Sequence, residues 1–146
     1  MNEETELRIF TEAGDEIPIP EGTARFISVE LRPLREGVAL EYDVNGTLVN
    51  LSDPAFDKFS LSLSSSVVEL PAFADMALGE LFTVEVPLVL RERGSSPSRP
   101  FVVGSSIAGA GWVEYRPVLS CRLSDRPFSG TEGVADVSWT LEFLEA

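Results

Sequence analysis

The fold class follows most directly from residues 111–146, whose sequence is GWVEYRPVLSCRLSDRPFSGTEGVADVSWTLEFLEA. Near the end of this stretch, apolar and polar residues alternate strictly, as they do in a strand with one buried and one solvated face. The apolar positions are Ala135, Val137, Trp139, Leu141 and Phe143, and the polar positions are Asp136, Ser138, Thr140 and Glu142. We therefore predict two strands, Trp112–Ser124 and Val134–Leu144, joined by a polar loop at 125–133.

Shorter strands are predicted upstream, wherever a similar alternation lies between turn-forming residues. They are Glu6–Phe10, Ala24–Arg32, Val38–Val44, Thr47–Leu51, a strand that starts at Phe59 and continues to Leu70 past a bulge at Ser64–Ser66, and Glu80–Arg91. Because Pro87 has no backbone N–H, the last of these is expected at a sheet edge or with a bulge.

Two local signals complete the prediction of the fold. Asn45-Gly46 indicates a hairpin, because both residues readily take the positive φ that a two-residue type I′ turn demands. The only helical candidate is Pro71–Leu78, where a proline stands at a first helical position and Gly79 follows the end. The sum is an all-β protein, an antiparallel β-sandwich or barrel of about six to nine strands with at most one short helix.

Length and charge narrow the class of protein. A chain of 146 residues suits a single domain that buries its core without disulfides. Its net charge of −13 argues against nucleic-acid binding across the surface, because phosphate contacts need Lys and Arg, and a confined acidic surface would repel DNA. The acidic amino terminus, MNEETE, is unlike a secretory signal, and no apolar run approaches the ~20 residues of a membrane span, so a soluble protein is expected.

No catalytic or ligand-binding motif is found in the sequence. The chain has no histidine, which excludes Ser-His-Asp and Cys-His arrangements. Residues 104–109, GSSIAG, lack the lysine and the spacing of a phosphate-binding loop, and Asp53 and Asp57 belong to no calcium-loop pattern. Carboxylate pairs for glycoside hydrolysis are assembled in space, so the sequence leaves them open. We predict no enzymatic activity, no metal ion and no other cofactor.

The longest irregular tract, Glu92–Gly111, is the candidate subunit interface. Tracts of this length inside a compact domain are uncommon, and they are usually functional or disordered. An arm that orders against a neighbouring subunit and a flexible solvated loop are both consistent with its small residues. For an arm, the predicted contact residues are Arg93, Arg99, Phe101, Val102, Val103 and Ile107.

The predicted core is drawn from the apolar faces of the strongest strands. It consists of Phe82, Val84, Val86, Tyr115, Leu119, Cys121, Val137, Trp139, Leu141 and Phe143. Cys121 is the only cysteine, so the chain has no intramolecular disulfide. Its position on the apolar side of a strand favours a buried structural thiol over a reactive one.

Residues 112–123, WVEYRPVLSCRL, resemble an aromatic-x-Tyr-Arg-Pro-x-Leu strand found near the end of small virion proteins of tailed bacteriophages. In those proteins a short loop and a terminal strand follow, similar to Val137–Glu145. The turn at Pro71-Ala72-Phe73 and the Gly- and Ser-rich tract before Trp112 fit the same layout, whereas Cys121 departs from it.

The resemblance implies a structural protein of the phage tail, in the tail tube or a tail-tip ring, with no active site. It implies synthesis in the host cytoplasm, location in the virion tail, and partners that are copies of itself and other virion proteins. Tail tubes and tail tips join β-sandwiches across subunits through extended arms, and their channels pass DNA without binding it. Two alternatives are a capsid decoration protein, usually a trimer on the shell, and a free-standing carbohydrate-binding or hydrolytic β-sandwich.

Overall fold

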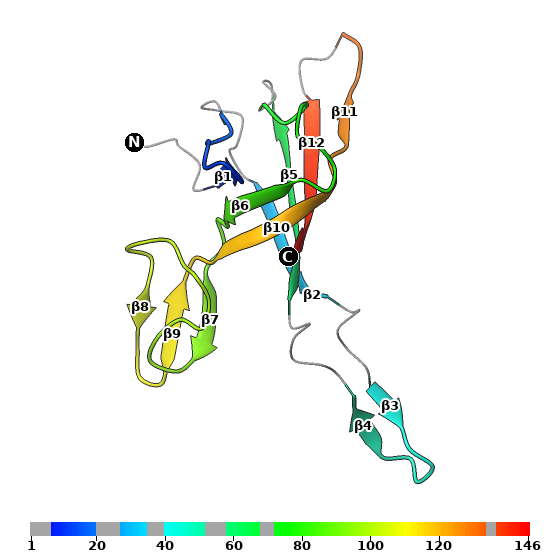
Figure 1. Ribbon diagram of the computed structural model, residues 1–146, viewed down its shortest axis with the longest axis vertical. Coiled ribbons are helices and arrows are strands. Elements are labelled where there is room, and N and C mark those ends of the chain that lie inside the picture. The colour runs from blue at the N-terminus through cyan, green and yellow to red at the C-terminus, as the bar shows by residue number, and fades with distance from the viewer. Residues whose placement is uncertain (1–6, 20–26, 35–39, 52–57, 68–71, 134–136) are drawn as a thin grey trace.

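The computed structural model describes residues 7–19, 27–34, 40–51, 58–67, 72–133 and 137–146 (Figure 1). Its strands are β1 (Arg8–Thr11), β2 (Ser28–Pro33), β3 (Leu40–Tyr42), β4 (Leu48–Asn50), β5 (Phe59–Val67), β6 (Leu81–Glu85), β7 (Leu90–Arg93), β8 (Ile107–Ala108), β9 (Trp112–Tyr115), β10 (Val118–Asp125), β11 (Phe128–Gly130) and β12 (Val137–Glu145). All pair antiparallel and the described residues contain no helix, so the predicted all-β class is confirmed. These twelve strands exceed the predicted number, because β8 and β11 form within tracts predicted as loops and two predicted strands are each divided in two.

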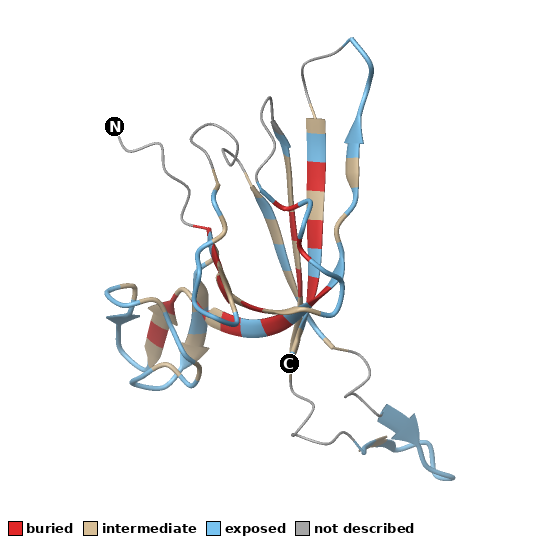
Figure 2. Ribbon diagram, turned by 45° about the horizontal axis from the view of Figure 1, so that its top comes forward, coloured by how far each residue is buried: buried red, intermediate tan, exposed pale blue. Residues whose placement is uncertain are grey.

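The main sheet has seven strands in the order β1-β6-β10-β12-β5-β2, with β11 also paired to β12. β12 is hydrogen-bonded on both sides, to β5 along one side and to β11 and then β10 along the other. β10 pairs with β12 through its second half and with β6 through its first half. The sheet therefore curls into a half-barrel whose edge strands are β1 and β2 (Figure 2).

The core fills one face of the curled sheet. From β12 it receives Trp139, Leu141 and Phe143, all with an exposed fraction of 1% or less. Phe73 and Met76, from the turns that follow β5, cover this face, and Phe73 meets Trp139 edge to face with 5.0 Å between ring centroids. This geometry is favourable for an aromatic pair. Every predicted core residue is buried except Val137, which is half-buried against the same cluster.

Two prolines divide predicted strands and create a second sheet. The strand predicted at Glu80–Arg91 is β6 and β7, and the one predicted at Trp112–Ser124 is β9 and β10. The ladder cannot continue through Pro87 or Pro117, because neither has an N–H to donate. The N–H of Val86 donates to the carbonyl of Pro117 at 3.0 Å, so both chain segments leave the main sheet at one corner. Beyond the corner, β7, β9 and β8 form the three-stranded small sheet (Figure 1).

The predicted hairpin is present as β3 and β4, but the predicted two-residue turn is wrong. The N–H of Asp43 donates to the carbonyl of Thr47 at 2.9 Å, and Val44, Asn45 and Gly46 lie between these residues. The Asp43 carboxylate accepts the N–H groups of Asn45 and Thr47, both at 2.9 Å. It thereby favours a type I turn that is closed by Gly46 at φ 78°.

The bulge predicted at Ser64–Ser66 does not occur. β5 pairs with β12 in one unbroken register from Val67 to Ser60, and Ser64 is also paired with Ser28 of β2. Because Ser64, Ser65 and Ser66 each pair with a residue of β12, the serines stay in regular ladder positions.

The predicted helix is also absent in its described part, residues 72–78, which form turns. Two bonds to β10 hold the end of this segment: the N–H of Gly79 donates to the Leu123 carbonyl at 2.7 Å, and the N–H of Leu123 donates to the Glu80 carbonyl at 3.1 Å. The strand predicted at Ala24–Arg32 is found from Ser28 to Pro33, and its first residues lie outside the described ones.

Trp139→Ala is expected to lower the free energy of unfolding by about 3–5 kcal/mol, since it empties the space beneath Phe73. Trp139→Phe should cost much less, because the indole Nε1 of Trp139 is buried without a hydrogen-bond partner in the described part of the chain. Urea unfolding followed by circular dichroism measures both changes. The control, Leu144→Ala on the exposed side of β12, should stay within about 0.5 kcal/mol, and equal losses for Trp139→Ala and Leu144→Ala would contradict this core.

Candidate subunit interface

The predicted interface tract is folded back on the rest of its own chain, and Glu92 of β7 holds its first half through hydrogen bonds. The Glu92 carboxylate accepts the Ser98 N–H at 2.6 Å, the Ser98 hydroxyl at 2.9 Å and the Tyr115 hydroxyl at 2.9 Å. Burial opposes ionisation of Glu92, but these hydrogen bonds outweigh it and lower its pKa below the ordinary 4.5. Burial, followed by the adjacent Glu92, raises the pKa of Tyr115 above 10.0, so the phenol stays protonated as the donor.

Arg99 fastens the same tract to the carboxyl end of β12. Its Nη1 lies 2.8 and 3.0 Å from the two carboxylate oxygens of Glu145, and its guanidinium lies 4.4 Å from the ring centroid of Phe59. Glu145 also accepts the backbone N–H of Phe59 at 3.0 Å. This half-buried ion pair joins the small sheet to the main sheet through side chains.

The six predicted interface residues therefore divide into two groups. Arg99 and Val102 are half-buried and bonded within the subunit, Val102 through its N–H to the Arg116 carbonyl at 2.9 Å. Phe101 packs edge to face on Tyr115, with 6.3 Å between ring centroids, yet keeps 39% of its surface exposed. Val103, Ile107 and Arg93 are exposed, so these three and Phe101 are available to a partner.

One face of the small sheet combines aromatic, aliphatic and basic side chains. The cross-strand pairs Arg93–Trp112, Arg91–Glu114 and Ile107–Glu114 place these five residues on the same side, which we call the outer face of the small sheet. The Arg91 guanidinium stacks 4.2 Å from the centroid of Trp112 and pairs with Glu114, whereas Arg93 has no ion pair among the described residues.

The glycine-rich end of the tract supports the Trp112 ring. Gly109 donates its N–H to the Trp112 carbonyl at 2.9 Å, and a Cβ at position 109 would overlap the indole. Glycine is therefore needed here for close approach to the ring. Packing against the Trp112 ring therefore explains one glycine of the Gly- and Ser-rich run, whether or not that run also contacts a partner.

The β3–β4 hairpin is the second exposed apolar surface, and the sequence did not identify it as one. Leu40, Tyr42 and Leu48 have exposed fractions of 53%, 74% and 52%, and Val44 at the tip is fully exposed. Neither strand contacts any other strand of the described chain, and Figure 1 shows the hairpin standing away from the main sheet. Alternating apolar residues predict a buried face, but they do not indicate whether this chain or another covers it.

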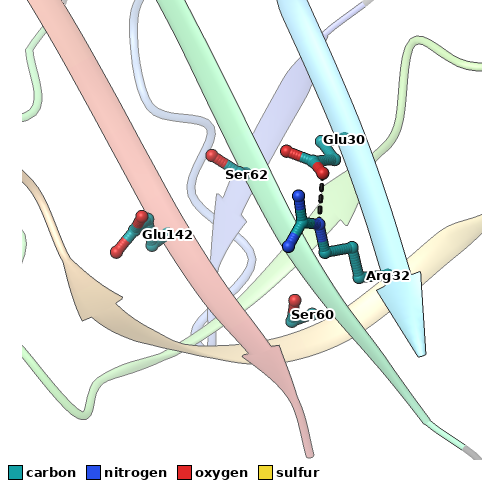
Figure 3. A pocket seen from close by; sticks show the side chains of 5 residues that line it. All are labelled: Glu30, Arg32, Ser60, Ser62 and Glu142. Carbon is teal, nitrogen blue, oxygen red and sulfur yellow. Dashed lines mark hydrogen bonds and ion pairs between the residues drawn. The ribbon is translucent and has the colours of Figure 1, made fainter. Parts of the chain in front are cut away.

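The side of the main sheet opposite the core carries a shallow polar hollow of about 270 Å³ (Figure 3). It is lined by Glu30, Arg32, Ser60, Ser62 and Glu142, from β2, β5 and β12. Arg32 pairs with Glu30 along β2, at one side of the hollow (Figure 3). Ser60 and Ser62 of the hollow come from the polar face of β5, whose alternation of polar and apolar residues the sequence predicted. The five lining residues form no recognisable pair of nucleophile and base.

Cys121 lies within the core, where burial and then the charge of Glu145 raise the pKa of its thiol to about 12. A thiol with this pKa remains protonated at neutral pH and has little nucleophilic character. In the described residues no cluster of three or more Cys, Asp or Glu side chains is placed to hold a metal ion. Those residues also include no helix with the length and apolar character needed to cross a bilayer.

Comparison with protein-family models, with curated proteins and with solved structures finds no match to this chain. Function must therefore be argued from the two exposed apolar surfaces and from the residues themselves.

Glu92→Gln is expected to lower the free energy of unfolding by about 1–2 kcal/mol at pH 7, because it removes a charged acceptor of three hydrogen bonds. Since folding lowers the pKa of Glu92, its contribution is present above pH 4.5 and is lost as the pH falls through the folded-state pKa. The difference in the free energy of unfolding between the wild type and Glu92→Gln should therefore become smaller as the pH falls. Urea unfolding across this range tests it, with Glu132→Gln on an exposed loop as control, and a constant gap would contradict the mechanism.

A double-mutant cycle on Arg99→Ala and Glu145→Ala is expected to give a coupling free energy of about 1–2 kcal/mol, because the pair is half-buried and shielded by Phe59. The exposed pair Arg8–Glu16 is the matched control and should give about 0.2–1 kcal/mol. Chemical denaturation measures both cycles. A coupling for Arg99–Glu145 no larger than that of the control would show that this ion pair does not fasten the two sheets.

Proposed function

We propose that the protein is a structural subunit of a bacteriophage tail, in the tail tube or a tail-tip ring, that assembles with copies of itself. The observation that carries the proposal is the presence of two separate apolar surfaces on one subunit, the β3–β4 hairpin and the small sheet. Grouped exposed apolar side chains mark interaction sites. Two different surfaces on each subunit permit head-to-tail contacts, which close into rings or extend into filaments.

The positions of the residues that carry the phage resemblance support this proposal. Tyr115-Arg116-Pro117 forms the corner at which the chain passes from β9 in the small sheet to β10 in the main sheet. The second resembling segment, Val137–Glu145, coincides with β12, the central strand of the main sheet. The residues that carry the resemblance therefore lie in the core strand β12 and at the connection that joins the small sheet to the core.

The charge of the chain agrees with a tail role. With −13 charges on 146 residues, the subunit would repel a DNA molecule that passes close to it. Exposed acidic side chains occur on several parts of the described surface, including Glu12, Asp75, Asp125 and Glu142. A tube or ring built from such subunits would pass DNA without retaining it.

The purified full-length protein is expected to form rings or stacked tubes with a central channel, because each subunit presents two different apolar surfaces. Native mass spectrometry gives the stoichiometry, and negative-stain electron microscopy shows the shape. An antibody against the protein should label the tail of the phage particle.

A protein that remains monomeric at its highest soluble concentration, together with antibody labelling away from the tail, would overturn the proposal. Labelling of the shell by a trimeric protein would indicate capsid decoration. Specific hits on a glycan array, or turnover of a polysaccharide, would indicate a carbohydrate-directed domain.

A further inference from the structure

The β3–β4 hairpin has too few contacts to be stable by itself. An isolated two-stranded hairpin is marginally stable in water, and stable ones pack on further strands or a hydrophobic surface. This hairpin pairs only with itself in the described chain, and its larger apolar side chains are exposed. A covering surface from another molecule would supply the missing contacts.

The apolar side chains of the hairpin form one continuous face. Tyr42 is directly opposite Leu48 in the register, and Leu40 lies two residues before Tyr42 on the same side of the strand. The opposite side carries Glu41 and the half-buried Val49. The hairpin therefore presents Leu40, Tyr42 and Leu48 together, and we call this set the apolar face of the hairpin.

The outer face of the small sheet has the complementary composition. The exposed Ile107 supplies an aliphatic surface, the half-buried Trp112 under the Arg91 guanidinium supplies an aromatic one, and Arg93 lies directly across from Trp112. Aromatic and arginine side chains are the residue types that contribute most at protein interfaces. On this face Arg91, Arg93 and Ile107 are exposed, and they come from the edge strands β7 and β8.

The hairpin and the outer face of the small sheet also differ in the sign of their charged residues. Glu41 lies on the side opposite the apolar face and Asp43 lies at the turn, so the border of that face is acidic, and residues 40–51 contain neither Lys nor Arg. The outer face of the small sheet carries Arg91 and Arg93 against one acidic residue, Glu114, on a protein whose net charge is −13. Arg91 is paired with Glu114, so Arg93 is the cation that docking would bring near the acidic border of the hairpin, whereas most other contacts between copies of an acidic protein bring acidic surfaces together.

We propose that the apolar face of the hairpin of one copy docks on the outer face of the small sheet of the next copy, with Tyr42 and Leu48 against Trp112 and Ile107. The docking rests on the proposed function only in taking the partner to be a second copy of the chain. It joins two different surfaces, so each copy both donates a hairpin and receives one. The contact is therefore head-to-tail and repeats from copy to copy.

Tyr42→Ser and Leu48→Ser, each in the full-length protein, are expected to weaken self-association about tenfold or more, as loss of a central apolar contact does at an interface. Arg93→Glu should weaken it as well, because it places a like charge opposite the acidic hairpin. Leu78→Ser is the matched control, since Leu78 is equally exposed but lies outside both surfaces. Sedimentation velocity over a concentration series measures association, and circular dichroism checks that each variant is folded.

Cross-linking tests which surfaces meet. A mixture of Leu48→Cys and Ile107→Cys proteins should form a disulfide-linked heterodimer on oxidation, and a mixture of Leu48→Cys and Leu78→Cys proteins should not. The native Cys121 is buried and will not compete.

Assembly that persists in all three variants, with no Leu48–Ile107 cross-link, would overturn the docking while leaving a tail role intact. A wild-type protein that never self-associates would overturn the docking too. Tail labelling in the phage particle then decides separately whether the proposed function fails with it.

Discussion

The pairing of β12 on both of its sides is the constraint on which the rest of the fold depends. β5 bonds along one side from Val137 to Leu144, while β11 and β10 share the other. Because β11 pairs with Val137–Trp139 on that second side, β10 pairs with β12 only from Glu142 to Glu145. β6 pairs along the other edge of β10 from Val118 to Arg122, overlapping the β12 ladder only at Cys121 and Arg122, and the offset sheet forms a half-barrel around Trp139, Leu141 and Phe143.

The corner at Val86 and Pro117 separates the part of the subunit that folds the core from the part that presents a surface. On one side of it the main sheet buries the core cluster, and on the other the small sheet and its loop leave Ile107 and Val103 exposed. Glu92 and the Arg99–Glu145 pair hold the intervening tract, together with the packing of Phe101 on Tyr115. These hydrogen bonds and this ion pair position the small sheet, while the exposed residues of its outer face remain accessible.

The sequence predicted the all-β class and the buried face of β12, because period-two alternation is a local property that burial on one side imposes. It missed the division of two strands at Pro87 and Pro117, since a proline indicates an edge, a bulge or a break equally well. It predicted the hairpin but not its turn, a three-residue loop in which the Asp43 side chain accepts two N–H groups and Gly46 takes the positive φ. Exposure of Tyr42 and Leu48 is a tertiary property, so their alternation, typical of burial, gave no sign of it.

The strand order has a consequence for how the chain reaches this state. β12 pairs with β5, and β10 pairs with β6, while β1 reaches β6 across most of the first half of the chain. Few of these ladders join segments that are adjacent in the sequence, so most loop-closure entropy is lost before the central contacts form. Folding of this chain should therefore be slow for its size, in the millisecond-to-second range of β-rich domains. The pairing of strands that are distant in the sequence should be the step that limits the folding rate.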